Sequence, residues 1–352
     1  TGSRVMAEQI PSIVDVAQRA GVSIATASRV ISRSTYPVSE ATRQKVLLAA
    51  EELKYTPNSL ARSLRTQRSN LIAVLVGDNT DPYFAEIARG VEEIANEHNY
   101  LTIICNAERD PKKEIHYLRS LKDYRIGGVI FAGGGLTIPG HIEQLEATVQ
   151  EMKQRGAAIV TLAQHTLHVP SIQVDNFEGA KNMTARLIAA GHQRIAFVSG
   201  PSDLLVANVR LQGYMTALVE NGYSIDPTLI FPGNFTREGG EQAINRIAHI
   251  EEKQRPTAIF GANDETAFGV LLGIRKQGWR VPDDLEVCGF GDLPFAQLVA
   301  PALTTVHIPL RELGRTGARE LLKLLNHEEI APLKILPTEI VERETTLPLS
   351  PQ

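Results

Sequence analysis

The stretch SIVDVAQRAGVSIATASRVIS, residues 12–32, predicts two short helices joined by a tight turn. Ser12 and Asp15 stand three residues apart, which is the spacing of a capping box at the start of a helix. Gly21 follows the last residue of this helical pattern, and a glycine there is a typical signal for a helix end. Ser23 is then in place to cap a second helix. The pattern is the layout of a helix-turn-helix, whose second helix enters the major groove of DNA.

The start of the second helix carries the side chains that would face the bases. Ile24 and Ala25 are apolar, so they can contact a thymine methyl group but cannot hydrogen-bond to a base. Arg29 lies one turn further on and can donate two parallel hydrogen bonds to guanine O6 and N7. Three short hydroxyl side chains suit phosphate oxygens, namely Ser23, Thr26 and Ser28. The alternative is a set of packed helices that carries an incidental arginine.

A third helix is predicted over about 40–54, and the apolar residues of the outer helices predict the core of this small domain. These predicted core residues are Val14, Val16, Ala17 and Ala20 in the first helix, and Val46, Leu47, Ala50 and Leu53 in the third.

Residues 57–68 predict a short hinge helix and a linker. Pro57 suits the first position of a helix, but a helix of about two turns is too short to be stable alone in water. Leu60 and Leu64 lie on one face of this helix and are flanked by arginines such as Arg62. An apolar wedge between arginines is how proteins open the minor groove. The candidate DNA contacts in this segment are Asn58, Leu60, Arg62 and Leu64.

Charge is distributed unevenly along the 352 residues, which hold 36 Lys and Arg and 40 Asp and Glu. Residues 1–70 contain ten basic and five acidic residues, so the remainder contains 26 and 35. A basic head on an acidic body suits a chain whose head alone meets phosphate. No apolar run approaches the roughly 18 residues of a membrane-spanning helix, and we see no signal peptide. We therefore expect a cytoplasmic protein, with Cys105 and Cys288 as buried free thiols.

Residues 69–348 alternate apolar strand-like runs with amphipathic helices. Near-continuous Val, Ile and Leu runs joined by helices predict parallel strands that are covered on both faces. The predicted strands are 71–76, 101–105, 128–132, 158–162, 171–174, 195–199, 258–261 and 285–290, and the helices include 84–98, 142–155, 178–190, 208–221 and 265–277. The pattern predicts an α/β domain of two doubly wound lobes.

Ligands of such sheets bind outside the carboxyl ends of the strands. Amides, carboxylates, one arginine and aromatic rings follow the predicted strands here, and this mixture suits a polar, hydroxyl-rich small molecule. The candidate ligand contacts at these strand ends are Asn79, Tyr83, Phe84, Arg210, Asn263 and Asp292. For each of them, capping or lining a loop is the alternative role.

The chain resembles the lactose-repressor and purine-repressor family, the LacI family, from residue 12 to about 345. The resemblance rests on DVAQRAGVSIATASRVIS, on VSEATRQKVLLAAEELKYTPNSLARSLRT and on the body. It implies a periplasmic-binding-protein-like body and a Leu64 that wedges into the central base step of the operator. Ile24 and Ala25 fall on the family's variable base-reading positions, and Arg29 on its common arginine.

The resemblance also implies effector contacts, because Tyr83, Phe84, Arg210, Phe235 and Asn263 match positions of the family's effector site. Two departures remove carboxylates that often hold sugar hydroxyls. Ala163-Gln164 stands where the family often has Asp-Arg, and Gly291 stands where it often has the first of two acidic residues. A small-molecule effector is therefore better supported than a monosaccharide.

The resulting hypothesis is a transcription repressor whose operator affinity depends on a sugar or related metabolite bound between the lobes. A homodimer is expected on a near-palindromic operator, because the tail lacks the leucine heptads of a tetramerising coiled coil. The predicted domains are 10–56 (helix-turn-helix), 57–68 (hinge helix and linker) and 69–348 (effector binding and dimerisation), with lobe one at about 69–169 plus 301–331 and lobe two at about 170–300 plus 332–348.

Two other classes stay open at this point. The body alone resembles periplasmic sugar-binding proteins, although the attached helix-turn-helix argues against that class. An enzyme is the third class, but the sequence has no nucleophile elbow, phosphate-binding loop or histidine pair with metal-ligand spacing. We therefore expect no catalytic residue, no metal and no cofactor.

Overall fold

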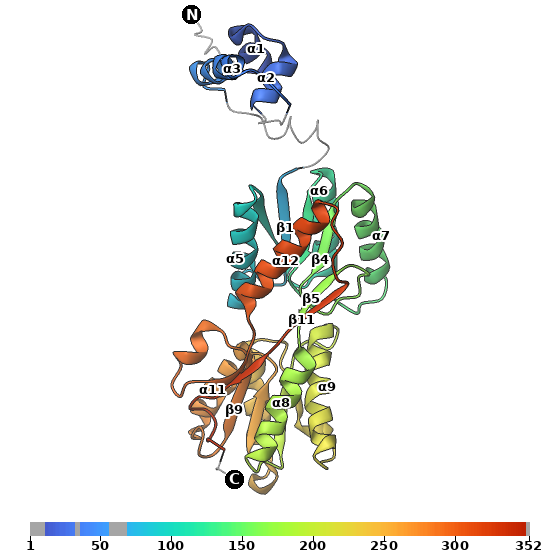
Figure 1. Cartoon of the computed structure of the whole chain (residues 1–352). Coiled ribbons are helices and arrows are strands. Elements are labelled where there is room, and N and C mark those ends of the chain that lie inside the picture. Colours follow the sequence, from blue (N-terminus) through green and yellow to red (C-terminus); the bar gives the residue numbers. More distant parts are fainter. Residues whose placement is uncertain (1–10, 32–35, 56–68, 350–352) are drawn as a thin grey trace, which may run out of the picture. The chain divides into compact units, whose positions relative to one another are not determined.

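The computed structural model describes residues 11–31, 36–55 and 69–349, and the chain divides into two compact units between Ser69 and Asn70. The N-terminal unit, here called the head, contains α1 (Ile13–Ala20), α2 (Ile24–Ile31) and α3 (Glu40–Glu52). The C-terminal unit, the body, contains two six-stranded sheets with their helices (Figure 1). The candidate contacts Asn58, Leu60, Arg62 and Leu64 lie outside the described residues.

The head is held together by a small apolar core, to which each of its three helices contributes one face. Six buried residues form it, namely Val16, Ala17, Ala27, Val30, Val46 and Ala49. Two predictions for this core were wrong, because Val14 and Leu47 are 49% and 44% exposed. Ile13 and Ala49 pack inward in their place, since each short helix touches its neighbours over a narrower arc than its apolar pattern covers.

The first sheet of the body has the strand order β11-β5-β4-β3-β1-β2, and its neighbouring strands are parallel. Its strands are β1 (Leu71–Val76), β2 (Leu101–Asn106), β3 (Gly128–Phe131), β4 (Ala158–Thr161), β5 (Ser171–Val174) and β11 (Leu333–Leu336). The helices packed with it are α5 (Pro82–Glu97), α6 (Pro111–Asp123), α7 (His141–Gln154) and α12 (Leu310–Leu325). We call this sheet and its helices lobe one.

The second sheet has the order β12-β10-β9-β8-β6-β7, and only β12 pairs antiparallel among these strands. Its strands are β6 (Ile195–Ser199), β7 (Ile230–Pro232), β8 (Ala258–Gly261), β9 (Glu286–Gly291), β10 (Thr304–His307) and β12 (Glu339–Val341). Its helices are α8 (Asn176–Ala189), α9 (Leu205–Glu220), α10 (Arg237–Ala248) and α11 (Asp264–Gln277), with short 3-10 turns at Pro227–Leu229, Glu252–Gln254 and Pro294–Gln297. This sheet and its helices form lobe two.

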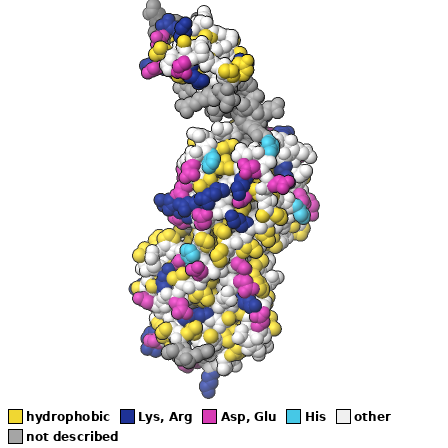
Figure 2. All heavy atoms as spheres, viewed as in Figure 1, with side chains coloured by type: hydrophobic (Ala, Val, Ile, Leu, Met, Phe, Trp, Pro, Cys, Tyr) yellow, Lys and Arg dark blue, Asp and Glu magenta, His cyan; other side chains and the backbone are white. Residues whose placement is uncertain are grey.

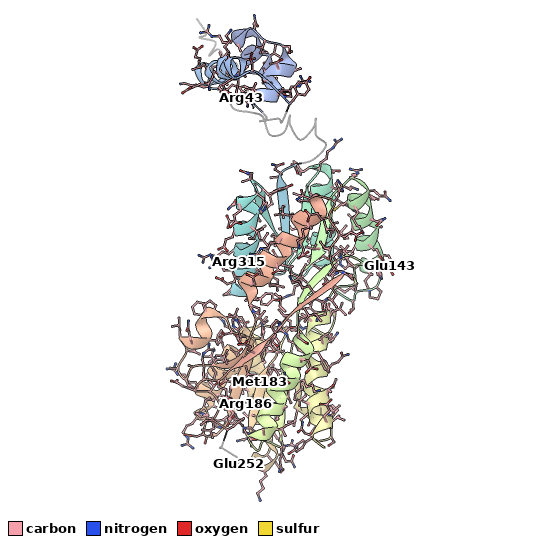
Figure 3. All side chains as sticks on the ribbon, in the orientation of Figure 1. Arg43, Glu143, Met183, Arg186, Glu252 and Arg315 are labelled. Carbon is pink, nitrogen blue, oxygen red and sulfur yellow. The ribbon has the colours of Figure 1, made fainter. Side chains whose placement is uncertain are left out.

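Alternate side chains of each central strand enter cores on opposite faces of the sheet, as parallel strands covered on both sides require. In β1, Ala73 and Leu75 pack with α6 and α7, whereas Ile72 and Val74 pack with α5 and α12. Arg315 on α12 and Arg186 on α8 lie on different lobes (Figure 3). Charged side chains of both signs are scattered among hydrophobic and uncharged ones on the visible face (Figure 2).

Three chain segments connect the lobes, and they lie later in the chain than the sequence predicts. The crossings are β5 to α8 at Asp175, β10 to α12 at 308–309 and β11 to β12 at 337–338. The predicted boundaries near 169/170, 300/301 and 331/332 therefore placed β5, β10 and β11 in the wrong lobe. These strands are four residues long, and strand pairing across the sheet, which local hydropathy does not encode, decides their lobe.

Candidate functional site

The turn between α1 and α2 has the geometry that the sequence predicts. The Ser12 hydroxyl accepts a hydrogen bond from the Asp15 backbone N–H, and the Asp15 carboxylate accepts one from the Ser12 N–H. Gly21 has φ of 66°, a left-handed conformation that favours glycine. The Ser23 hydroxyl then accepts a hydrogen bond of 3.1 Å from the Thr26 N–H, so it caps α2. These contacts set the direction in which α2 leaves the turn.

Helix α2 separates a packed face from an exposed face. Ala27 and Val30 are buried in the head core, while Ile24 is 50% exposed and Ala25 is exposed. Arg29 is also exposed, and its guanidinium carbon lies 4.0 Å from the centre of the Tyr36 ring. A cation over an aromatic face is attracted by the ring quadrupole, which restrains the arginine. The three side chains predicted to meet bases are therefore presented together on the outside of the head.

The predicted hydroxyl contacts lie beside this surface. Ser23 is exposed, and its hydroxyl group lies 2.9 Å from that of Thr26. Thr26 and Ser28 are half-buried. Of Ser23 and Thr26, the hydroxyl that accepts in their shared hydrogen bond keeps its single O–H donor for a phosphate oxygen.

The body contains a cavity of about 520 Å³, its open mouth included, which we call the body cavity. It takes residues from loops and helices of both lobes. Its lining residues are Asp81, Tyr83, Phe84, Arg109, Gly133, Gly134, Ala163, Val206, Arg210, Phe235, Asn263, Phe290 and Leu293. Five of the seven predicted ligand contacts line it, namely Tyr83, Phe84, Arg210, Phe235 and Asn263.

Arg210 is the most constrained of these side chains. It is 4% exposed, its Nε donates a 2.8 Å hydrogen bond to Asn176 Oδ1, and its Nη1 donates one of 2.7 Å to the Ala262 carbonyl. Its guanidinium also lies 3.9 Å from the centre of the Phe290 ring. Burial lowers the pKa of Arg210 to about 10, because the charged form loses hydration, and the group stays charged at neutral pH. A fixed positive charge therefore faces the cavity.

The order of the Arg210 side chain depends on residues of both lobes. Asn176, the first residue of α8, donates from Nδ2 to Gln164 Oε1 at 3.0 Å and accepts from Arg210 through Oδ1. Gln164 thus takes part in a hydrogen-bonded chain from the loop after β4 to α9. Its neighbour Ala163, the other residue of the departure from the family pattern, lines the cavity and brings no polar side-chain atom.

Two predicted contacts do not line the body cavity. Asn79 exchanges hydrogen bonds with Asn106 across the ends of β1 and β2. The Asp292 carboxylate accepts from Arg343 Nη2 at 2.6 Å and lies 2.9 Å from His307 Nδ1. Asp292 therefore contacts chain segments beside the lobe crossings, and whether either residue touches a ligand stays a prediction.

The cavity also contains functional candidates that the sequence reasoning did not select. Asp81 caps α5, and burial raises the pKa of its carboxyl group. Arg109 lies in the loop between β2 and α6, within NAERDPKKE, where it looks like one charge among several on a solvated helix start. Phe290 ends an apolar strand and reads as core. Only the pairing of β1 with β2 and of β9 with β10, which the local sequence does not show, brings these residues to the cavity.

A buried carboxylate lies behind the cavity. Asp264, the first residue of α11, is fully buried and accepts hydrogen bonds from the Thr305 hydroxyl and from the Leu293 N–H. Burial raises the pKa of Asp264 to about 6, because the two hydrogen bonds offset only part of the lost hydration. Its contacts join α11 to β10 and to the loop that contributes Leu293 to the cavity.

Within residues 11–31, 36–55 and 69–349, no three His, Cys, Asp or Glu side chains lie close enough together to hold a metal ion. In the same ranges, no helix has the length and apolar character needed to cross a membrane. Cys105 and Cys288 are buried free thiols, as predicted.

Comparison with known protein families gives two matches. Residues 12–58 match the bacterial regulatory proteins of the lacI family, and residues 184–346 match the periplasmic binding protein-like domain. The first match spans the helix-turn-helix, and the second spans most of lobe two and the later strands.

Curated relatives match over nearly the whole chain. Catabolite control protein A of Priestia megaterium is 35% identical over 339 residues, which cover 95% of this chain and 99% of that protein. The HTH-type transcriptional repressor PurR of Aliivibrio fischeri (strain MJ11) is 33% identical, with coverage of 90% and 93%.

Solved structures have the same architecture. The lac repressor dimer bound to operator and the anti-inducer ONPF has a TM-score of 0.83 and 27% identity, covering 97% of this chain and 100% of that one. The transcriptional regulator CelR–cellobiose complex has a TM-score of 0.67 and 30% identity, covering 95% and 99%.

Proposed function

Because the chain belongs to the lacI family of bacterial regulatory proteins, we propose that it is a sequence-specific DNA-binding transcription repressor controlled by a small metabolite. The exposed face of α2 carries this proposal. Ile24, Ala25 and Arg29 stand together on the outside of a helix whose other face is packed. Such a helix can enter the major groove without losing its core.

The base contacts follow from the chemistry of these three side chains. Ile24 and Ala25 read thymine methyl groups, and Arg29 donates to guanine O6 and N7. Stacking on Tyr36 limits the orientations of the Arg29 guanidinium, which lowers the entropy that it loses on binding a guanine. The hydroxyl groups of Ser23, Thr26 and Ser28 bind phosphate oxygens and set the position of α2. The hinge residues Asn58, Leu60, Arg62 and Leu64 complete the proposed contacts, with Leu64 as the wedge in the minor groove.

A homodimer is the proposed DNA-binding form. The outer strand β2 exposes Leu101, Ile103 and Ile104 by 66%, 38% and 52%, and such an apolar edge suits burial against a second copy. A two-fold dimer presents two recognition helices to two half-sites, so the operator is expected to be near-palindromic.

The body cavity is the proposed effector site, and an effector there acts on DNA binding through the lobes. It takes residues from both lobes, so a ligand in it favours one arrangement of the lobes over another. The ligand shifts the equilibrium only by its difference in affinity for the two arrangements. Tyr83, Phe84, Arg210, Phe235 and Asn263 are the proposed contacts. We propose no catalytic activity and no cofactor, since the cavity serves here to sense and not to convert its ligand.

Selection of binding sites from a random pool of duplex DNA tests the proposal. We expect the full chain to enrich a two-fold symmetric site, either alone or in the presence of a metabolite mixture. Arg29→Gln should lose enrichment at one guanine in each half-site, because glutamine cannot make the paired contact with O6 and N7. Lys153→Gln, which removes one charge from α7 in the body, is the matched control. Failure to enrich any site under both conditions would contradict the DNA-binding role.

A further inference from the structure

The body cavity has many more hydrogen-bond donors than acceptors among its lining side chains. Five lining residues carry polar side-chain atoms, namely Asp81, Tyr83, Arg109, Arg210 and Asn263. The other lining side chains are apolar or are glycines. The class of ligand that fits the cavity therefore depends on which of these polar atoms are still available.

Arg109 brings a second positive charge to the cavity, and the Asp78 and Asp81 carboxylates attract it without a direct ion pair. Across the described part of the chain, its guanidinium makes no hydrogen bond and no ion pair, and it lies 5.9 Å from the centre of the Phe235 ring. Its stem packs over Gly77, where an added Cβ would lie 3.3 Å from Arg109 Cγ and 3.0 Å from the Phe84 ring. The contact with Gly77 keeps the side chain beside the cavity, where all five N–H donors remain available.

Arg210 adds further donors on the other side of the cavity. Its Nε and one Nη1 hydrogen are bound by Asn176 and by the Ala262 carbonyl. The second Nη1 hydrogen and the two Nη2 hydrogens make no hydrogen bond with the described residues. Phe235 lies between the two cations, since Arg210 is 5.7 Å from the centre of its ring.

Acceptors are few, because most lining acceptors already bind backbone N–H groups. Asp81 Oδ1 accepts from the Tyr83 N–H at 2.9 Å, and Asn263 Oδ1 accepts from the Thr266 N–H at 2.9 Å. The second oxygen of Asp81 and the Tyr83 hydroxyl are the lining side-chain acceptors that remain. The carboxylate of Glu114, in the adjoining cavity of about 460 Å³ that Arg109 also lines, binds His141 at 2.7 Å.

The cavity lining also has more positive than negative charges, which favours the same class of ligand as its excess of hydrogen-bond donors. Two guanidinium groups face one lining carboxylate, Asp81, and burial raises the pKa of its carboxyl group. A net positive charge in a site with aromatic walls attracts an anion strongly, because the surroundings screen the charges less than bulk water does. The hydroxyl groups of a neutral polyol can accept hydrogen bonds from these N–H donors, but they bring no negative charge to balance the two guanidinium groups.

We propose that the ligand of the body cavity is a ring-bearing anion whose phosphate or carboxylate group binds Arg109 while its ring packs among Tyr83, Phe235 and Phe290. This inference rests on the proposed function of the cavity as the effector site. Arg109 supplies two parallel N–H donors that match the spacing of the anion's oxygens.

Thermal unfolding of the full chain with matched probes tests the inference. The probes are galactose, galactose 6-phosphate, galacturonate and inorganic phosphate, so the same ring is compared with and without an anionic group. We expect the anionic probes to raise the melting temperature at concentrations at which galactose does not. A larger effect of galactose 6-phosphate favours a phosphate ligand, and a larger effect of galacturonate favours a carboxylate.

Variants assign the effect to the proposed residue. Arg109→Gln should weaken binding of the anionic probes at least about tenfold, the usual scale for loss of one charged hydrogen-bonded partner. Arg109→Lys should bind the anionic probes with an affinity between those of the wild type and Arg109→Gln, because lysine keeps the charge but not the paired donors. Arg119→Gln, which removes an exposed charge of α6 outside the cavity, should change nothing.

Three results would overturn the inference: galactose binding as tightly as its anionic forms, anion binding that survives Arg109→Gln, or no response to any anion. DNA is absent from this assay. An anion that binds without altering operator affinity would therefore leave the inference standing and count against the proposed effector role.

Discussion

Asp264 is the described side chain with the clearest conflict between charge and burial. It is completely enclosed, yet its carboxylate holds α11, β10 and the Leu293 loop together through two hydrogen bonds. Its ordinary pKa of 3.8 rises to about 6 in the folded chain, because burial disfavours the anion. The folded protein thus binds this proton more tightly than the unfolded chain does.

Protein stability should consequently depend on the ionisation of Asp264. Its favourable contribution is complete below pH 3.8 and is lost as the pH rises through about 6. The loss amounts to about 3 kcal/mol by neutral pH, from a shift of about two pKa units. The asparagine side chain in the variant Asp264→Asn cannot ionise, so the variant does not lose this stability as the pH rises. The difference in free energy of unfolding between variant and wild type should therefore shift by about 3 kcal/mol in favour of the variant from about pH 4 to about pH 7. Urea titrations at both pH values measure it, and a difference that does not vary with pH would contradict the assignment.

At the scale of single elements, helices α5 and α12 approach each other closely at glycines. A Cβ at Gly314 would lie 2.1 Å from the Ile87 carbonyl oxygen, and one at Gly90 would lie 2.1 Å from the Arg311 carbonyl oxygen. Both obstacles are backbone atoms, which cannot move aside as a flexible side chain can. Glycine at these positions therefore sets the spacing of the two helices that cover one face of the first sheet.

Gly314→Ala should force α5 and α12 apart and lower the free energy of unfolding by about 1–3 kcal/mol, the usual cost of overpacking. Lys323→Ala, at an exposed position of the same helix, should change it by less than about 0.5 kcal/mol. Chemical unfolding of the full chain measures both. Equal stability of the two variants would show that the helices separate without cost.

Prediction from the sequence succeeded for elements whose information is local. Ser12 and Gly21 placed the two ends of α1, and Ser23 placed the start of α2, because caps and tight turns depend on a few adjacent side chains. The central strands were predictable from their apolar runs. The strands β7, β10, β11 and β12 were missed. β7 and β12 are only three residues long, and β11 is mostly exposed at the edge of its sheet. Three of the four residues of β10 are threonine or histidine, so no apolar run marks this strand.

In the candidate site, too, residues with a local sequence signal were predicted and residues that depend on distant contacts were not. Arg210 and Asn263 were predictable because they follow buried strands in a doubly wound pattern. Arg109 and Asp81 were not selected, because the sequence shows charges and caps but not which loops meet across the body cavity. Asn79 and Asp292 stand at strand ends like the others, but Asn106 in one case and Arg343 in the other engage their side chains away from the cavity.

At the scale of the whole molecule, the exposed apolar side chains of strand β2 offer a position at which the proposed homodimer can be tested. Ile104→Glu should place a charge in the proposed dimer contact, convert the dimer into a monomer and weaken binding to a two-fold operator at least about tenfold. Val219→Glu, at an exposed apolar position on α9, is the control. Sedimentation equilibrium and operator titration check the two effects. A variant that stays dimeric would exclude this strand from the interface.

The three crossings between the lobes also govern the order in which the chain can fold during its synthesis. The described head ends at Tyr55, so all of α1, α2 and α3 leave the ribosome before any strand of the body. Lobe one must wait much longer, because β5 pairs with β11 at Leu333–Leu336. Lobe two waits for β12 at Glu339–Val341. Nascent chains therefore carry a completed DNA-reading head well before the sensing body that is proposed to control it, and a chain that stops after α12 would lack an edge strand in each lobe.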